Sequence, residues 1–248
     1  MSNMPFALTI AGFDGSGGAG ILADIKVFEA FGVYGQAVCT AMTVQNERSF
    51  SAPGWVPWEQ IQAQLETLQE IRAFHFIKIG LVENADVLAK IVAWVRKNNP
   101  AAYLVWDPIM SASAGYRFFK EDNADAFFPI FAQMNLITPN QFEFAYLGLG
   151  VADSRDEVAI GTQVSILLKG GHAQGDTATD VLWTHGERLK YTSPRISGEG
   201  KHGTGCTLSS AILANLALGK TLPEACQIAK EYMDHFLKGG EGLLGRVH

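Results

Sequence analysis

The chain has few cysteines, little positive charge and no long run of apolar residues. Its three cysteines, Cys39, Cys206 and Cys226, are too few and too widely spaced for a disulfide framework or a zinc cluster. An odd cysteine count, with an N-terminus that lacks the features of a signal peptide, predicts a reducing, cytoplasmic location. Apolar stretches stay well short of the roughly 20 residues that span a bilayer, so no membrane segment is expected.

Basic residues are outnumbered by acidic ones. The chain has 19 Lys and Arg against 25 Asp and Glu, a formal net charge of −6. Nucleic acid is therefore not an expected partner, because a surface that binds it carries a basic excess. The 248 residues, 48% hydrophobic and 18% charged, are sufficient for one large globular core. Without repeats, linkers or low-complexity segments, a single domain over residues 1–248 is expected, with a glycine-rich mobile tail at about 239–248.

Short apolar runs alternate with helical patterns along the chain. Strands are predicted over residues 6–11, 37–44, 74–79, 102–106, 135–137, 164–168, 179–184 and 188–193. Helices are predicted over residues 19–31, 61–71, 87–95, 122–132, about 140–147, 207–218 and 223–237. This alternation predicts an α/β fold with a mostly parallel central sheet and helices on both faces. Ligands of such sheets bind outside the carboxyl ends of the strands.

A glycine-rich loop, residues 198–207, leads into the helix predicted over residues 207–218. The backbone N–H groups of such a turn have no intrahelical partners, and with the positive end of the helix dipole they attract phosphates. Cys206 lies in this turn, where a thiolate is favoured near neutral pH. An anion site with a possible base inside it predicts phosphoryl transfer to a small alcohol. A tight helix N-terminus with a buried thiol is the alternative that the local pattern leaves open.

A second glycine-rich turn follows the first predicted strand. Gly15, Gly17 and Gly20 match the dinucleotide-binding pattern GxGxxG, which would indicate an NAD-binding oxidoreductase. Two features count against this function: Asp14 would place a carboxylate beside the pyrophosphate, and Gln45 stands near the position where an acidic residue is expected. A turn that lets helix and strand pack closely is the alternative. The phosphate-binding sequence GxxxxGK[ST] does not occur.

Polar residues that could hold a metal or phosphates follow several predicted strands. Asn140 and Glu143 lie three residues apart at the start of a helix and face the same side, and with Asp107 they could hold Mg²⁺, partly through water. Helix capping by Asn140, with Glu143 near the positive end of the dipole, is the alternative that the local pattern favours. Lys169 ends an apolar strand, where it could counter nucleotide phosphates or be an exposed strand end.

Taken together, these segments resemble the hydroxymethylpyrimidine/phosphomethylpyrimidine kinases of thiamin biosynthesis, within the ribokinase-like superfamily. The matching segments run through nearly the whole chain in order. They are residues 8–12, Asp14, residues 16–20, 23–24 and 32–35, Thr43, residues 45–46, 78–80, 107–110 and 138–140, Glu143, and residues 169–172 and 202–210. The most specific is His-Gly-Thr-Gly-Cys-Thr-Leu-Ser-Ser at 202–210.

The resemblance implies a ribokinase-like three-layer sandwich, a homodimer, and an ATP-dependent, Mg²⁺-dependent kinase. Its substrate would be the hydroxymethyl group of 4-amino-5-hydroxymethyl-2-methylpyrimidine, and then the monophosphate. Carried over by position, Cys206 would be the base, within an anion hole formed by Gly203, Thr204 and Gly205. The other implied residues are Asp107, Asn140 and Glu143 for magnesium, Lys169, Asn140 and Thr204 for ATP, and Gln45, Asp24, Gly12, Gly80 and Ile109 for the pyrimidine.

Three departures from the family's pattern concern the shape of the substrate pocket. Phe13 stands where the family more often has serine, Leu81 replaces a common methionine, and residues 111–116 differ from the usual run. Pyridoxal/pyridoxine kinases, built on nearly the same framework, are therefore the main alternative. A pyrimidine-binding sensor without turnover is a further alternative, although the presence of Asp107, Glu143, Lys169 and Cys206 together speaks against it.

Overall fold

The computed structural model describes residues 4–112, 115–118, 124–149, 164–171, 175–196, 201–240 and 242–246. Its strands are β1 (Phe6–Phe13), β2 (Tyr34–Gln45), β3 (Phe50–Trp55), β4 (Phe76–Ile79), β5 (Tyr103–Trp106), β6 (Leu136–Ile137), β7 (Ser165–Leu168), β8 (Thr177–Thr184) and β9 (Glu187–Pro194). Its helices are α1 (Gly20–Ala30), α2 (Trp58–Gln69), α3 (Ala85–Asn98), α4 (Phe128–Phe131), α5 (Gln141–Tyr146), α6 (Thr204–Ala217) and α7 (Leu222–Lys238), with a 3-10 turn, η1 (Ala124–Phe127), before α4.

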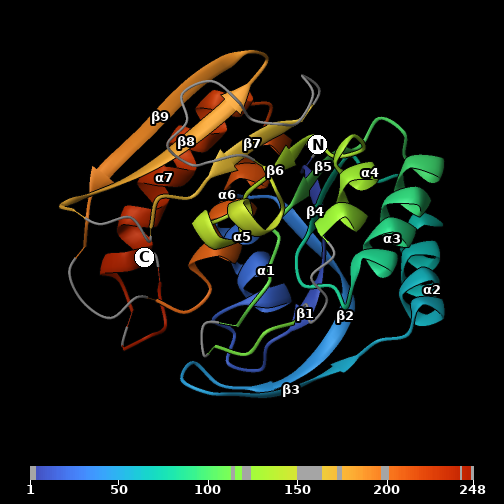
Figure 1. Ribbon diagram of the computed structural model, residues 1–248. Coiled ribbons are helices and arrows are strands. Elements are labelled where there is room, and N and C mark those ends of the chain that lie inside the picture. The colour runs from blue at the N-terminus through green and yellow to red at the C-terminus, as the bar shows by residue number, and fades with distance from the viewer. Residues whose placement is uncertain are drawn as a thin grey trace.

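The described strands form one nine-stranded sheet in the order β3-β2-β1-β4-β5-β6-β7-β8-β9 (Figure 1). Six consecutive strands of this sheet, β2-β1-β4-β5-β6-β7, are parallel to one another. Antiparallel pairs close both edges, with β3 on one side and the β8–β9 hairpin on the other. Helices lie on both faces of this sheet, so the predicted three-layer α/β class is confirmed. The carboxyl ends of the parallel strands meet at one edge of the sheet, where ligands of such folds bind.

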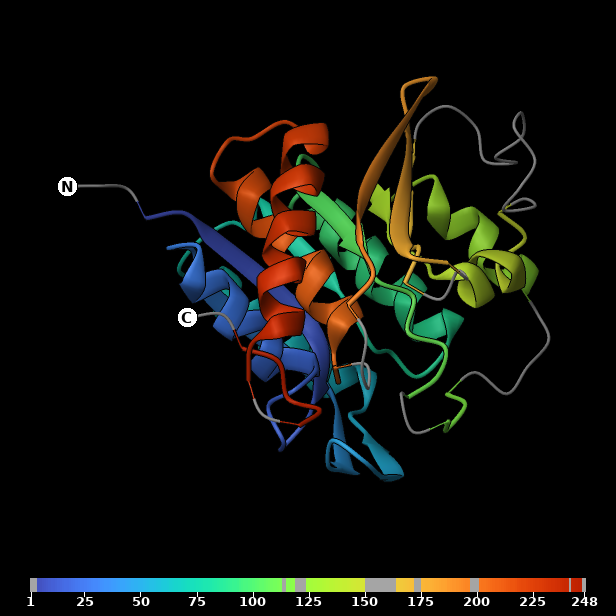
Figure 2. The ribbon, with the colours of Figure 1, turned by 90° about the vertical axis from the view of Figure 1, so that its left-hand side faces the viewer.

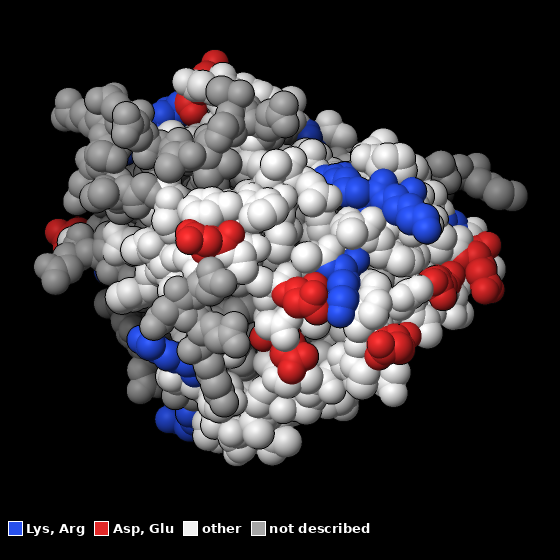
Figure 3. Space-filling view, turned by 45° about the vertical axis from the view of Figure 1, so that its right-hand side comes forward, with Lys and Arg blue, Asp and Glu red and all other residues white. Residues whose placement is uncertain are grey.

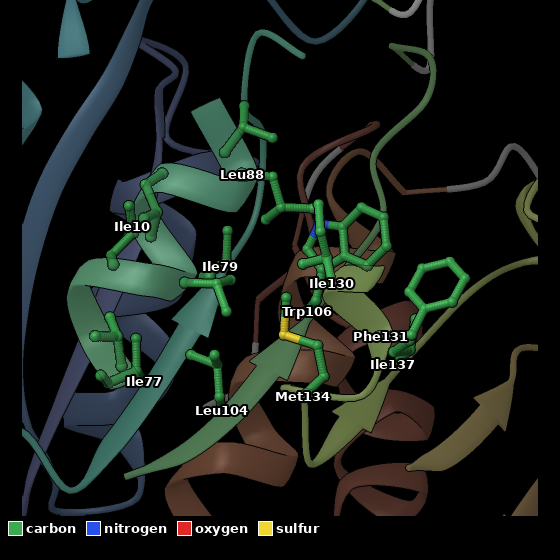
Figure 4. Close-up of a cluster of buried hydrophobic side chains, with 14 of the residues drawn as sticks. Ile10, Ile77, Ile79, Leu88, Leu104, Trp106, Ile130, Phe131, Met134 and Ile137 are labelled. Atoms are coloured by element: carbon green, nitrogen blue, oxygen red, sulfur yellow. The ribbon is translucent and has the colours of Figure 1, made fainter. Parts of the chain in front are cut away.

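One face of the sheet packs against α2, α3, α4 and α5. Alternate residues of β4 and β5 point to this side, among them Ile77, Ile79, Leu104 and Trp106 (Figure 4). The Trp106 ring stacks on Phe127, with ring centroids 5.4 Å apart. Because burial of large side chains is the main favourable term in folding, this cluster holds the central strands against the helices.

The opposite face is covered by α1, α6 and α7, as Figure 2 shows. Apart from Asn215, helix α6 consists of apolar or small residues around its whole circumference, and every residue from Cys206 to Leu216 is buried. A helix of that kind must be enclosed on all sides, and α6 lies between the sheet and its neighbours α1 and α7. Its N-terminus is therefore held by the protein core rather than by a surface loop.

The structure differs from the prediction in two elements, one strand that was not predicted and one predicted helix. Strand β3 was not expected, because its sequence contains Pro53 and Gly54 and lacks alternation; an edge strand tolerates both, since one of its sides needs no partner. The helix predicted over residues 122–132 is instead η1 followed by the single-turn α4, with Pro129 in the first turn of α4. Proline lacks the N–H that a continuous helix needs there. Residues 122 and 123 lie outside the described part.

The end of the described chain folds back on the loop before α6. The backbone N–H of His202 donates to the Leu243 carbonyl at 2.8 Å, and Lys201 Nζ donates to the Gly242 carbonyl at 2.5 Å. These contacts join the described residues of the predicted tail to the loop before α6. Within the described ranges, every helix is too short or too polar to cross a membrane. On the face drawn in Figure 3, basic and acidic side chains form small separate groups rather than one broad basic area.

Candidate active site at the N-terminus of α6

The loop before α6 interlocks with the first glycine-rich turn. Gly203, the N-cap residue, has a left-handed φ of 76°, and a Cβ there would lie 1.8 Å from the carbonyl oxygen of Gly18. Glycine is thus required at this position both for backbone conformation and for space. As a glycine, Gly203 has no side chain with which to cap α6. The first N–H groups of α6, including those of Thr204 and Gly205, form the turn in which the sequence predicts an anion site.

The glycine-rich turn after β1 is built around the carboxylate of Asp14. This group accepts hydrogen bonds from the N–H groups of Ser16 at 2.9 Å and Ala19 at 3.0 Å, and it contacts His202 Nε2 at 2.8 Å. Burial works to raise the pKa of Asp14, but its contacts with His202 and Ser16 outweigh burial and lower the pKa. The amides that a dinucleotide phosphate would need are therefore already occupied.

Close packing explains the third glycine of the same turn. Gly20 has a φ of 60°, and a Cβ there would lie 2.2 Å from the carbonyl oxygen of Gly12. The geometry agrees with a tight strand–helix turn, which was the alternative to a dinucleotide site. It gives no support to an NAD-binding oxidoreductase.

The Cys206 sulfur lies between the N-termini of two helices. It belongs to the first turn of α6, and it accepts a hydrogen bond from the N–H of Gly20, the first residue of α1. Nevertheless, burial raises the pKa of Cys206 to about 11, and the negative charges of Asp24 and Asp107 act in the same direction. The prediction of a thiolate near neutral pH is wrong for the ligand-free protein, because desolvation outweighs the helix terminus.

This protonation state predicts the reactivity of the thiol. In the ligand-free protein the alkylation rate of Cys206 is expected to rise about tenfold per pH unit up to about pH 10, because only the thiolate reacts. Iodoacetamide labelling, followed by mass spectrometry of the peptide that contains Cys206, measures this rate. Cys226, whose pKa burial also raises, is the internal control in the same digest. A rate that levels off below about pH 8 would contradict the raised pKa.

A lysine and two carboxylates lie beside the first turn of α6. Lys169 Nζ is 2.7 Å from Asp107 Oδ1 and 3.6 Å from Glu143 Oε2. A Cβ at Gly205 would lie 3.2 Å from Lys169 Nζ and 3.5 Å from Asp107 Oδ2. Three segments that follow different strands thus meet at the amides of α6. The hydroxyl of Ser209, one turn further along α6, donates to Asp107 Oδ2 at 3.2 Å.

Charge balance within this cluster is uneven. Burial works to raise the pKa of Asp107, but the positive charges of Lys169 and Lys78 outweigh it and lower the pKa. Burial raises the pKa of Glu143, and the charge of Asp107 adds to that rise. The cluster thus favours the anion of Asp107 more than that of Glu143.

Asn140 and Glu143 form a capping box at the start of α5, as the local pattern favours. Asn140 Oδ1 accepts from the N–H groups of Phe142 at 2.9 Å and Glu143 at 3.0 Å, and Glu143 Oε2 accepts from the N–H of Asn140 at 2.7 Å. The side-chain oxygen of Asn140 is therefore used within the cap, which argues against its binding a metal directly.

The donor set fits a magnesium ion bound together with a nucleotide, not a preformed metal cage. Among the described residues no group of three or more His, Cys, Asp or Glu is arranged for a metal. Asp107 and Glu143 do face one another across Lys169. Magnesium is commonly held by one or two carboxylates, with phosphates and water completing its shell.

Four of the residues that the resemblance assigns to the substrate lie at or just after the carboxyl ends of strands: Gly12 in β1, Gln45 in β2, Gly80 after β4 and Ile109 after β5. A Cβ at Gly80 would lie 3.8 Å from Ile109 Cδ1, and one at Gly12 would lie 3.0 Å from Leu81 Cδ2. Gln45, at the end of β2, pairs in the sheet with Phe50. The sheet register thus brings Gly12, Gly80 and Ile109 together beside the β2–β3 hairpin.

An aromatic cluster next to these residues was missed by the sequence reasoning. Phe50 lies 4.8 Å from Tyr116 and 5.2 Å from Phe118, measured between ring centroids, and Trp55 lies 6.2 Å from Phe118. Ile109 packs against the same cluster. Its rings come from β3 and from the segment after β5. Only the tertiary structure brings these two segments together, so no local signal could have indicated the cluster.

Asp24 does not reach the surface of the site. Its carboxylate has no exposed area and accepts hydrogen bonds from Thr9, Lys78 and Ser210. The structure thus places it beneath α6, whereas the resemblance implies a position near the pyrimidine ring or its hydroxymethyl arm. Lys78 and the Asp14–His202 pair are further buried polar groups near the site. The sequence reasoning gave neither of them a role.

The fold and the site together fit a phosphotransferase class of α/β protein, since the N-terminus of α6 lies beside a lysine and two carboxylates. The family model for phosphomethylpyrimidine kinase matches residues 14–246. A hydroxymethylpyrimidine/phosphomethylpyrimidine kinase of Aquifex aeolicus is 35% identical over 246 residues, which cover 96% of each chain. The chain therefore belongs to the phosphomethylpyrimidine kinase family, and it is a kinase.

Solved structures agree with this family and with its ribokinase-like fold. Phosphomethylpyrimidine kinase from Clostridium difficile 630 is 34% identical with a TM-score of 0.73, covering 93% of this chain and 98% of that one. Pyridoxal kinase from Staphylococcus aureus, solved in complex with AMP-PCP, is 28% identical with a TM-score of 0.84, covering 98% of this chain and 91% of that one. The pyridoxal kinase has the backbone more similar to this chain, whereas the phosphomethylpyrimidine kinase has the more similar sequence. The substrates of both kinases are therefore included in the test of function.

Proposed function

We propose that this kinase transfers the γ-phosphoryl group of ATP to the hydroxymethyl group of 4-amino-5-hydroxymethyl-2-methylpyrimidine, and then phosphorylates the monophosphate. The observation that carries the proposal is the position of Cys206. It lies in the first turn of α6, and the Lys169–Asp107–Glu143 cluster lies against Gly205 in the same turn. A nucleotide phosphate at this turn would thus have an anion site and a cation beside it.

The roles of the residues follow from the charge that develops during transfer. Phosphoryl transfer passes through a loose transition state with charge on the equatorial oxygens. The amides of Gly203, Thr204 and Gly205 would face those oxygens, and Lys169 would counter the phosphates of the donor. Asp107 and Glu143 would hold Mg²⁺, which supplies further positive charge at the phosphates when bound. Asn140 would act by orienting Glu143 through the cap.

Cys206 would take the proton of the alcohol as the new O–P bond forms, acting as the thiolate after it has released its own proton to solvent. General bases of this kind commonly contribute about 10²–10⁴-fold to the rate. The resting protein holds this group as a thiol, so the role depends on the groups that favour its anion. Those groups are the Lys78 ammonium and the Gly20 amide.

The pyrimidine would bind against the aromatic cluster at the β2–β3 hairpin. Gln45 would hydrogen-bond the aminopyrimidine, and Gly12, Gly80 and Ile109 would leave space for the ring and its hydroxymethyl arm. Phe50 and its neighbouring rings offer the apolar surface on which a flat heteroaromatic ring stacks. Asp24 would act indirectly, through its contacts with Lys78 and Ser210 beneath α6.

An ADP-release assay tests the substrate. The pyrimidine alcohol, its monophosphate, pyridoxal and pyridoxine are compared in parallel, and the pyrimidine alcohol is expected to have the highest kcat/KM. Preferential turnover of pyridoxal would favour the second candidate function, pyridoxal kinase. This candidate is included because the pyridoxal kinase from Staphylococcus aureus has a TM-score of 0.84 with this chain. Absence of ADP release with every substrate would contradict both.

A substitution at Gln45 tests the binding of the ring. Gln45→Ala is expected to raise KM for the pyrimidine alcohol about tenfold, the cost of one lost hydrogen bond of about 1.4 kcal/mol, with a smaller change in kcat. Steady-state kinetics at saturating ATP measure both constants. Gln62→Ala, on the exposed side of α2, is the matched control. An unchanged KM in Gln45→Ala would remove Gln45 from the substrate site.

The proposal also includes a homodimer, a single domain over residues 1–248 and a cytoplasmic location. Sedimentation of the purified protein tests the dimer, since a protomer has a mass of 26.9 kDa. A single species near that mass would contradict it.

A further inference from the structure

A lysine without any exposed surface lies beneath the first turn of α6. Lys78 is on β4 between Ile77 and Ile79, whose side chains point to the α3 side of the sheet. Because side chains alternate along a strand, Lys78 points to the α1 and α6 side. A buried ammonium costs several kcal/mol unless good partners compensate it. Its retention at a position suited to an apolar residue therefore needs an explanation.

The partners of Lys78 come from three neighbouring elements. Its Nζ donates to Asp24 Oδ1 of α1, to the carbonyl oxygen of Cys206 at 3.2 Å and to Ser210 Oγ at 3.2 Å, both in α6. Ser210 Oγ donates to Asp24 Oδ1 at 2.7 Å, and Thr9 Oγ1 of β1 donates to Asp24 Oδ2 at 2.6 Å. All three donors of the ammonium are used. One buried point thus joins β1, β4, α1 and α6.

This point is directly connected to Cys206. Lys78 binds the carbonyl group of Cys206, while the N–H of Gly20 binds its sulfur. Lys78 and Gly20 are thus the groups that favour an anion at the sulfur, whereas Asp24 and Asp107 oppose it. Lys169 adds a positive charge on the side of the nucleotide site, where it pairs with Asp107.

We propose that Lys78 is a positioning residue of the transfer reaction: its buried ammonium fixes the first turn of α6 through the carbonyl of Cys206 and supplies the positive charge that the sulfur needs when it loses its proton. This inference rests on the proposed role of Cys206. Burial works to lower the pKa of Lys78, but Asp24 and the other acidic neighbours outweigh it and raise the pKa, so the group is charged. An ion pair kept only for stability could be replaced by a neutral pair.

The test compares two variants that differ only at position 78. Asp24→Asn keeps Lys78, whose positive charge then depends on Asp107 and on its hydrogen bonds to the Cys206 carbonyl and Ser210, whereas Lys78→Met/Asp24→Asn removes the lysine without leaving a buried unpaired charge. Any effect of Asp24 on substrate binding is common to both variants. Relative to Asp24→Asn, the double variant is expected to lose about tenfold or more in kcat at pH 7, with KM for ATP changed less than about twofold. The rising limb of its pH–kcat profile is expected to shift upward by about one unit.

Alkylation of Cys206 gives a second readout that does not depend on turnover. At about pH 9 the double variant is expected to react about tenfold more slowly than Asp24→Asn, and Asp24→Asn faster than the wild type. If this order appears but the wild type phosphorylates no substrate, the charge role of Lys78 stands and the proposed function fails. If the wild type is active but the two variants match in kcat, pH profile and alkylation, the proposal is overturned.

Folding is checked by thermal unfolding of each variant. Lys78→Gln/Asp24→Asn, a polar and neutral pair, is the second variant if the methionine pair does not fold. Failure of both neutral pairs while Asp24→Asn folds would assign Lys78 to stability alone, and would also overturn the proposal.

Discussion

Replacing Cys206 with alanine is expected to lower kcat by about 10²–10⁴-fold, the usual contribution of a general base. The substitution removes the proton acceptor but leaves the backbone amides of α6 in place. KM for ATP is therefore expected to change less than about twofold. Steady-state ADP release with the pyrimidine alcohol measures both constants.

Cys226→Ala is the matched control for this experiment. Cys226 is also buried, at 2% exposure, but it lies on α7 in the core cluster with Phe236 and Met233, away from the site. Its variant is expected to keep kcat while losing about 1 kcal/mol of stability, because a small buried group is removed. Near-normal turnover in Cys206→Ala would remove Cys206 from the mechanism and leave the anion site as the main source of catalysis.

Replacing Gly203 with alanine is expected to damage both the site and the fold. The residue has a left-handed φ of 76°, and its new Cβ would lie 1.8 Å from the Gly18 carbonyl oxygen. The loop must move to relieve this contact, and the amides of Thr204 and Gly205 move with it. Loss of one aligned donor at such a site costs about 10²–10³-fold in kcat. Turnover and the thermal midpoint of unfolding are measured together.

Gly219→Ala separates the effect of conformation from that of the contact. Gly219, just after the other end of α6, has a φ of 83°, and a Cβ there meets no atom within 4 Å. Its variant carries only the left-handed penalty of about 1–2 kcal/mol and is expected to keep its activity. Gly203→Ala should lower the thermal midpoint further than Gly219→Ala. Equal midpoints with normal turnover in both would show that the interlocked loops are not required.

Much of the architecture could be predicted from the order of residues. The parallel strands and the helices after them have strong periods, since a strand repeats every two residues and a helix every 3.6. The weak points were β3, where Pro53 and Gly54 break the pattern, and the region of α4, where Pro129 interrupts the helix. In both, a local signal depends on context: proline is acceptable at a sheet edge and at a helix start.

The candidate site was predictable in part, for the same reason. The glycines before Cys206 and the carboxylates after their strands are local patterns, and the fold brings them together as the carboxyl ends of neighbouring strands require. The capping box formed by Asn140 and Glu143 is also a local sequence pattern. The aromatic cluster around Phe50 is not, because its members come from distant segments that carry no shared pattern.

The sequence alone determined the α/β class, the likeness to a kinase family and the turn in which negative charge would collect. Only the tertiary structure decided that Cys206 rests as a thiol, that Asp24 is enclosed and that Lys78 lies beneath α6. A hydrogen-bonding turn depends on neighbours along the chain, whereas the protonation of a group depends on desolvation and on charges that long-range packing brings near. Those charges come from α1, β4 and the end of β5.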